Sequence, residues 1–220
     1  MFLAVVARPR FDAQGNEIFL GKIGVFPFVT LERARRASAN RAADTLETKP
    51  ITSVTKDKVR SYLIEKVIPA IKAKWPREDL NYPIFIQQDN ARAHIQLVDE
   101  EFCRVATQNG FDIRLTSKPP NSPDLNVLGL VFLELFSPYG IRSHLQLLMS
   151  YLLQLRSHSN NIFLTLQSCM VEIMRAKGCH NYKIPHLSKA MLERKGQLPS
   201  QLKCDALLVQ EVLSYLDGSN

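Results

Sequence analysis

An aspartate that directly follows an apolar run is the residue of this sequence best placed for chemistry. The run YPIFIQQD ends at Asp89, and Asn90, Arg92 and His94 follow closely. A strand that feeds a helix places its ligands outside its carboxyl end, so a carboxylate here could bind a cation. Two-metal phosphoryl transfer, however, needs several carboxylates around ions about 3.5–4 Å apart. A single Asp is therefore a weak signal, and an Asp that only caps the following turn explains it equally well.

Two strands are predicted at the start of the sequence. Residues 1–11 and 18–29 are largely apolar and flank a turn at Gly15-Asn16, which predicts a hairpin. The polar stretch 31–41 is expected to form a loop or a loose helix whose arginines could contact phosphates, although a solvated charged surface explains them equally well. These arginines are Arg33, Arg35, Arg36 and Arg41.

Residues 56–75 carry apolar side chains at roughly helical spacing and predict an amphipathic helix. Pro69 should kink or split this helix, because proline lacks an N–H and crowds the preceding turn. The apolar positions are Val59, Leu63, Val67, Ile68, Ile71 and Trp75.

Strand and helix then alternate as far as residue 130. The predicted elements are a buried strand over 82–89, a helix over 98–110, a strand over 111–117 and, after a proline-rich turn, another helix. This alternation is typical of an α/β fold with parallel strands. Beyond residue 160 only helices are predicted, and Asp205 is the expected N-cap of the last one.

Charge and cysteine usage narrow the class of protein. The net charge is +7, divided as +6 over residues 1–80, −2 over 81–130 and +3 over 131–220. Basic flanks suit a polyanion and an acidic centre suits a cation, although an ordinary basic protein has the same balance. The four cysteines lack zinc-site spacing and suit a reducing compartment. Neither a signal peptide nor a membrane span is expected.

Several long motifs resemble the catalytic domain of plant mariner-like transposases. FIQQDNARAH, residues 85–94, and GFDIRLTSKPPNSPDLNVLGLVFL, residues 110–133, carry the resemblance, and segments from both ends of the chain match in the same order. The likeness covers nearly the whole chain except about residues 134–158. The resemblance implies a ribonuclease H-like fold on which an Asp-Asp-Asp triad holds divalent metal ions for DNA strand cleavage and transfer.

The resemblance implies roles for four residues. Asp89 matches the second catalytic Asp, which binds a metal ion, Mg²⁺ in the family, that activates water or a DNA 3′-OH. Arg92 matches a position in the same motif, and Lys118 and Asn121 match the turn before the last catalytic helix, so these three are expected to bind nucleic acid. The implied partners are transposon-end DNA and either a second copy of the chain or an intact transposase. The implied location is the nucleus.

The other two positions of the triad lack Asp. The family's first catalytic Asp lies upstream of MFLAVV, so we expect this chain to begin after it; an omitted upstream exon would supply it. The position of the third Asp is occupied by Gly129, and 39 residues lie between Asp89 and Gly129. Asp124 stands at the spacing of the animal branch, but there too the catalytic Asp lies beyond the Ser-Pro-Asp. We therefore expect Asp124 to cap the next helix.

Residues 134–158 break the likeness. Codons for Leu135–Pro138 and for Leu147–Leu152 can encode the family's motifs in another reading frame, which is consistent with two compensating frameshifts. The segment is rich in leucine and has one acidic residue, Glu134. It is therefore a candidate for an exposed apolar patch that promotes association. Sequencing the locus against an intact relative would test the frameshift.

The expected architecture is an α/β chain with an incomplete ribonuclease H-like fold, that is, a mixed sheet lacking its first strand. Residues 1–133 are expected to be a partial catalytic domain, 134–158 a divergent segment and 159–220 a C-terminal helical extension. Each backbone group that loses its partner costs about 1–3 kcal/mol against a total stability of about 5–15 kcal/mol. The hairpin and the 82–130 unit should then form locally but pack imperfectly, unless strand 1–11 moves across, and should not melt cooperatively above about 50 °C.

The expected function is that of an inactive remnant of a transposase catalytic domain, because the one remaining carboxylate should bind Mg²⁺ weakly or not at all. The alternative is a retained module that binds nucleic acid or intact transposase without catalysis. Affinity for duplex DNA that falls steeply with salt would favour this alternative.

Overall fold

The structure is a computed structural model that describes residues 1–38, 41–128, 159–179 and 181–218. These residues form two units: Met1–Val6 with Ile23–Ser117, and Ala7–Lys22 with Lys118–Asn220. Short strands and helices are both present, and they alternate over residues 56–117, which confirms the prediction of a mixed α/β chain. Gly129 and the divergent segment 134–158 lie outside the described residues.

The strands pair into two-stranded sheets. The pairs are β1 (Phe2–Val6) with β4 (Lys22–Pro27), β2 (Arg10–Phe11) with β3 (Glu17–Phe19), β5 (Val29–Arg33) with β6 (Leu46–Pro50), and β7 (Ile84–Gln88) with β8 (Ile113–Ser117). In the part of the chain that the structure describes, no ladder joins the first of these pairs to the last, so the expected mixed sheet is present only as separate ladders.

The hairpin predicted from residues 1–11 and 18–29 is interrupted. Strand β2 pairs antiparallel with β3, with Arg10 opposite Phe19 and Phe11 opposite Glu17. The chain approaches itself closely at the interruption, where Ala7 N donates to Gly21 O over 2.6 Å. Only glycine fits there, since Gly21 has a φ of +77° and a Cβ would lie 2.0 Å from Ala7 O.

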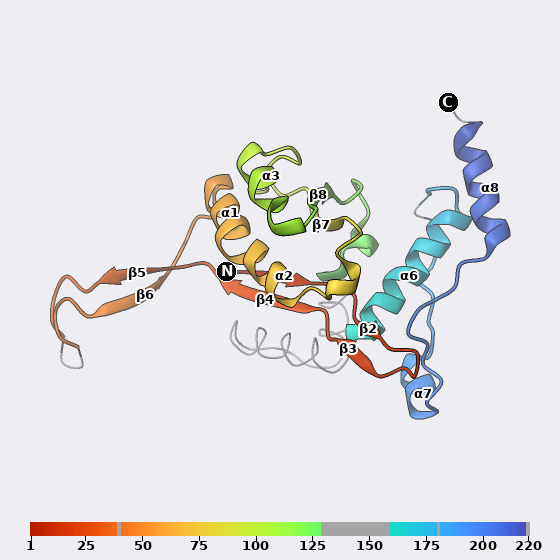
Figure 1. Cartoon of the computed structure of the whole chain (residues 1–220), viewed down its shortest axis with the longest axis horizontal. Helices are drawn as coiled ribbons and strands as arrows, with labels where there is room; N and C mark the ends of the chain where they lie inside the picture. Colours follow the sequence, from red (N-terminus) through yellow and green to blue (C-terminus); the bar gives the residue numbers. More distant parts are fainter. Residues whose placement is uncertain (39–40, 129–158, 180, 219–220) are drawn as a thin grey trace. The chain divides into compact units, whose positions relative to one another are not determined.

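Residues 29–50 form a second hairpin, which the sequence did not predict. Strands β5 and β6 are antiparallel and run side by side in Figure 1. The expectation of a loop or loose helix from residue 31 was wrong at its start, because residues 31–33 belong to β5. Lys49 of β6 bonds to Glu32 of β5 over 3.0 Å, so the polar residues that suggested a loop partly pair across the ladder.

The predicted amphipathic helix is present and is divided as Pro69 required. Helix α1 (Lys56–Tyr62) continues through a π-helical turn (Leu63–Val67) into α2 (Ile68–Lys74). Because Pro69 has no N–H to donate to the preceding turn, a local widening of the helix just before it is the expected response. Five of the six predicted apolar positions are buried, and Trp75 is half-buried.

Polar contacts attach this helix to the first part of the chain. The Tyr62 hydroxyl donates to Pro27 O over 3.0 Å and accepts from Val29 N over 3.2 Å. The Tyr62 ring centroid lies 4.5 Å from that of Phe28, and Lys74 Nζ donates to Ile23 O over 2.6 Å. These bonds satisfy backbone groups near both ends of β4 and at the start of β5.

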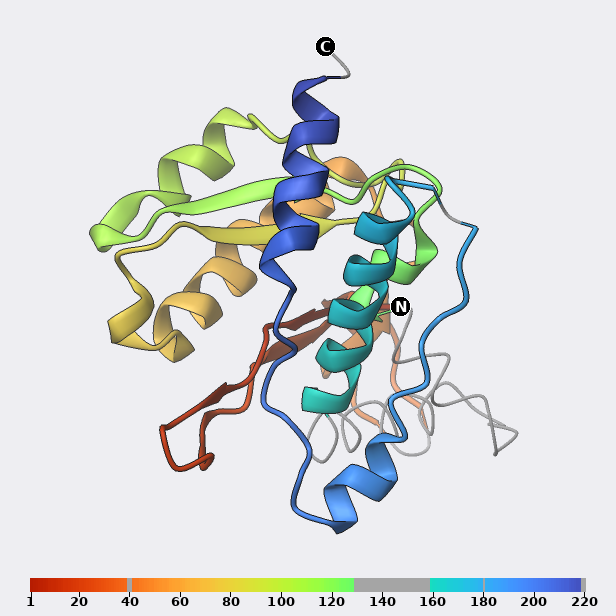
Figure 2. The same cartoon turned by 90° about the vertical axis from the view of Figure 1, so that its right-hand side faces the viewer.

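The predicted strand–helix–strand unit after residue 82 is confirmed. Strands β7 and β8 are parallel, in register from Ile84 opposite Ile113 to Gln88 opposite Ser117, and lie side by side in Figure 2. The crossover carries helix α3 (Glu100–Ala106), which packs against β8. Its buried anchor is Phe102, whose side chain is fully shielded from solvent.

The C-terminal third is helical, as predicted. It contains α6 (Ser159–Arg175), α7 (Lys189–Arg194) and α8 (Ala206–Asp217), and α6 packs against α8. Asp205 is the predicted N-cap of α8, and its carboxylate accepts from Leu207 N over 2.9 Å. Among the described residues, no helix is long and apolar enough to cross a membrane.

Candidate functional site

Asp89 lies at the carboxyl end of a parallel strand. It is the first residue after β7, whose last residue, Gln88, is opposite Ser117 at the end of β8. The carboxyl ends of parallel strands are where α/β proteins place ligands, and the Asp89 side chain is 46% exposed. The structure therefore places the predicted catalytic residue where a ligand can reach it.

The Asp89 carboxylate also organises its own turn. Its Oδ1 accepts from Ala91 N over 3.0 Å and lies 3.0 Å from His94 Nδ1. The same His94 nitrogen lies 2.6 Å from the Asp89 backbone oxygen. Because both neighbouring oxygens are acceptors, His94 bonds to them only when a proton lies on Nδ1. The capping role considered from the sequence is thus realised, and Asp89 has protein partners that a metal ion would have to share.

The turn after Asp89 is fixed at its far end by the strand itself. Gln88 Nε2 donates to Ile95 O over 2.8 Å, and Ile95 is buried. Within this turn, His94 N donates to Ala91 O over 3.0 Å. Arg92, one of the residues expected to bind nucleic acid, lies between them and is exposed. Its side chain is therefore available to an anionic partner.

The other two residues expected to bind nucleic acid belong to the second unit. Lys118 is half-buried and follows β8 directly, and Asn121 is exposed in the proline-rich turn. Asn121 has a φ of +56°, a left-handed conformation that asparagine tolerates better than most residues. A turn requirement thus accounts for Asn121 without a ligand.

Asp124 bonds to a residue distant in the sequence, whereas the helix that it was predicted to cap falls largely outside the described residues. Its carboxylate accepts a hydrogen bond from the Tyr182 hydroxyl over 3.0 Å. The short 3₁₀ turn at Pro123–Leu125 has no side-chain cap. Burial, then the bond to Asp124, raises the pKa of Tyr182 to about 12. Burial also raises the pKa of the Cys169 thiol, with Asp124 as a further cause.

The described residues hold little that could cage a metal ion. Within residues 1–38, 41–128, 159–179 and 181–218, no group of three or more His, Cys, Asp or Glu side chains is arranged to bind one. A lone carboxylate with an exposed face can at most contribute one or two oxygen ligands of the roughly six that Mg²⁺ requires. The arrangement around Asp89 is suited to hold its turn.

Sequence analysis missed two features that the fold brings together. Tyr182 had no recognisable motif, and its partner Asp124 lies far away in the sequence. Arg8 and Arg10, within the predicted first strand, line a cavity with Ser200 and Gln201 from the other end of the chain. Arg8 and Arg10 are at positions i and i+2 of a predicted strand, so their side chains share one face of that strand. This pair of like charges was the signal in the sequence that could have indicated the cavity.

Comparison with known proteins yields no match: no family model, curated protein or solved structure is similar to this sequence.

Proposed function

We propose that this chain is a catalytically inactive remnant of the catalytic domain of a mariner-type DNA transposase. The observation that supports the proposal is the position of Asp89 in a strand–helix–strand unit with parallel strands, where a metal-binding carboxylate of such a domain would lie. The motif around it, FIQQDNARAH, supplies the resemblance.

Inactivity follows from the chemistry that two-metal catalysis demands. The ions must be held by several carboxylates, so that one oxygen is activated while the leaving oxygen is stabilised. Gly129 stands at the position where the family carries its third Asp, and glycine offers no side-chain ligand. Asp89 itself is shared with His94 Nδ1 and Ala91 N. We therefore expect no productive pair of metal ions.

The second candidate is a module that binds nucleic acid or an intact transposase without catalysis. Exposed arginines at the end of the β5–β6 hairpin favour it, because clustered guanidinium groups attract a phosphate backbone. These are Arg33, Arg35 and Arg36. Binding without cleavage is compatible with the loss of the third carboxylate, so the two candidates share the expectation of no chemistry.

Supercoiled plasmid nicking tests the proposal directly. The 220-residue chain is incubated with plasmid and Mg²⁺ or Mn²⁺, beside the Asp89→Ala variant. The unaltered chain and Asp89→Ala should give the same background level of plasmid nicking in the presence and absence of metal. A metal-dependent nick made by the unaltered chain and lost in Asp89→Ala would contradict the proposal.

A further inference from the structure

A cavity of about 430 Å³ in the second unit is lined by residues from both ends of the sequence. Its size falls in the range of about 300–1,000 Å³ that is usual for small-ligand sites. Two of its lining residues are arginines, and the described residues that line it include no carboxylate. They are Arg8, Pro9, Arg10, Phe11, Ser200 and Gln201.

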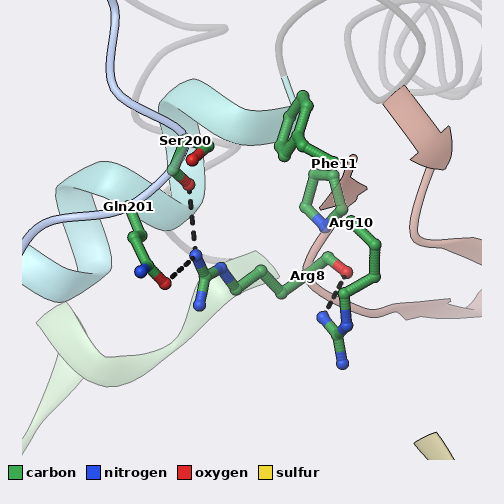
Figure 3. A pocket seen from close by; sticks show the side chains of 6 residues that line it. Arg8, Arg10, Phe11, Ser200 and Gln201 are labelled. Carbon is green, nitrogen blue, oxygen red and sulfur yellow. Dashed lines mark hydrogen bonds between the residues drawn. The ribbon is translucent and has the colours of Figure 1, made fainter. Parts of the chain in front are cut away.

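The Arg8 guanidinium is held in place by neutral acceptors. Its Nη2 donates to Ser200 O and to Gln201 Oε1, each over 3.1 Å, as Figure 3 shows. These two bonds orient the group without neutralising its charge. Its Nε is buried and has no hydrogen-bond partner among the residues that the structure describes. A buried N–H donor without a partner is unfavourable, so a ligand that accepts from it would be favoured.

Arg10 brings a second positive charge to the same cavity. Its Nη1 donates to Arg8 O over 2.9 Å, so the side chain turns back toward the backbone of Arg8 (Figure 3). The two cations affect each other, because burial and, second, the charge of Arg10 lower the pKa of Arg8. An anion bound beside the Arg8 guanidinium would offset both causes, the burial and the nearby positive charge.

We propose that this cavity, the Arg8–Arg10 pocket, binds a phosphate group. Guanidinium groups match the geometry of phosphate oxygens better than ammonium groups do. The Ser200 hydroxyl and the Gln201 amide add hydrogen-bond donors among the lining residues. The assignment of a nucleic-acid backbone as the source of the phosphate rests on the proposed function, whereas the pocket itself does not depend on it.

Two substitutions and a matched control test the pocket in the full chain. Arg10→Gln removes one charge. Gln201→Glu is nearly isosteric and places a carboxylate against Arg8, where it should compete with a bound anion. Lys203→Gln removes one charge from an exposed position two residues beyond the pocket. Because the control changes the net charge as much as Arg10→Gln does, it separates a specific site from a general charge effect.

Two probes distinguish the sources of the phosphate. Fluorescence anisotropy measures affinity for a labelled duplex of about 20 base pairs at several salt concentrations, and phosphorus NMR line broadening measures binding of inorganic phosphate. Arg10→Gln and Gln201→Glu should each weaken duplex binding about fivefold or more, and Arg10→Gln should lower the salt slope by about one, with Lys203→Gln changing affinity less than about twofold. Inorganic phosphate should compete with the duplex.

The results distinguish a failure of the pocket proposal from a failure of the proposed function. If inorganic phosphate binds with the same dependence on Arg10 and Gln201 but the duplex does not, the pocket stands with free phosphate as its ligand and the nucleic-acid assignment fails. If neither Arg10→Gln nor Gln201→Glu weakens either probe more than Lys203→Gln does, the pocket proposal is overturned.

Discussion

The Oδ1 atom of Asp89 lies 3.0 Å from the Nδ1 atom of His94, within a turn that begins where strand β7 ends. The same oxygen accepts from Ala91 N. The residue that the sequence singles out for metal chemistry is therefore also the residue that shapes its loop. A substitution at Asp89 changes both the charge available to a metal ion and the conformation of the loop, so experiments at this position need a variant that separates the two effects.

Asp89→Asn provides that separation. Asparagine retains an oxygen that can accept from Ala91 N but carries no negative charge, whereas alanine removes both. We expect Asp89→Ala to loosen the turn and Asp89→Asn to leave it largely intact. Arg92 is exposed in this turn and is a trypsin site, so the rate of cleavage after Arg92 in limited proteolysis reports the effect. Equal cleavage rates in the two variants would show that the side-chain oxygen does not hold the turn.

Phe102 should be essential for the strand–helix–strand unit. Its side chain is fully buried beneath α3, and truncation to alanine leaves a cavity that costs about 3–5 kcal/mol. Phe85 on β7 is the matched control, because its side chain is 59% exposed. Urea unfolding followed by circular dichroism should show a large loss of stability for Phe102→Ala and less than about 1 kcal/mol for Phe85→Ala. Similar losses for both would mean that α3 is not packed as described.

Tyr182 should make stability depend on pH in the alkaline range. Its pKa is raised from 10 to about 12 in the folded chain. Between these values the unfolded state has lost the phenolic proton while the folded state retains it, so the free energy of unfolding falls as pH rises from about 10 to about 12. Tyr182→Phe should lack this pH-dependent part of the free energy of unfolding. It should also lose the bond to Asp124, which is worth about 1–2 kcal/mol at neutral pH.

The measurement is urea unfolding of both proteins at pH values across this range. Arginines and lysines titrate equally in both, so the difference between the two curves isolates Tyr182. The unaltered chain should be the more stable at neutral pH, and the difference should shrink as pH rises. A difference that stays constant up to pH 12 would contradict the raised pKa of Tyr182.

Local patterns predicted the elements well because their causes are local. Helical spacing of apolar residues located α1 to α2, and a proline without an N–H predicted the irregularity before Pro69. The strand, helix and strand around Asp89 followed from alternation of apolar runs and turn residues. Each of these features depends on residues within about one turn or one strand of each other.

The rest depends on pairings that leave no local trace. The β5–β6 hairpin was missed because charged residues such as Glu32 and Arg33 read as a loop, although cross-strand partners such as Lys49 stabilise them. The bond from Tyr182 to Asp124 and the bond from Arg8 to Ser200 join residues 58 and 192 positions apart. Periodicity cannot predict such contacts, because they depend on how distant elements pack.

Diffraction from crystals soaked in manganese tests the central claim most directly, because anomalous scattering locates each ion and its ligands. Asp89 belongs to no group of three or more metal-binding side chains among the described residues, so it should hold at most one weakly occupied ion, alongside its bonds to His94 and Ala91. Two well-ordered ions about 3.5–4 Å apart at Asp89, completed by other side chains of this chain, would contradict the claim that this is an inactive remnant.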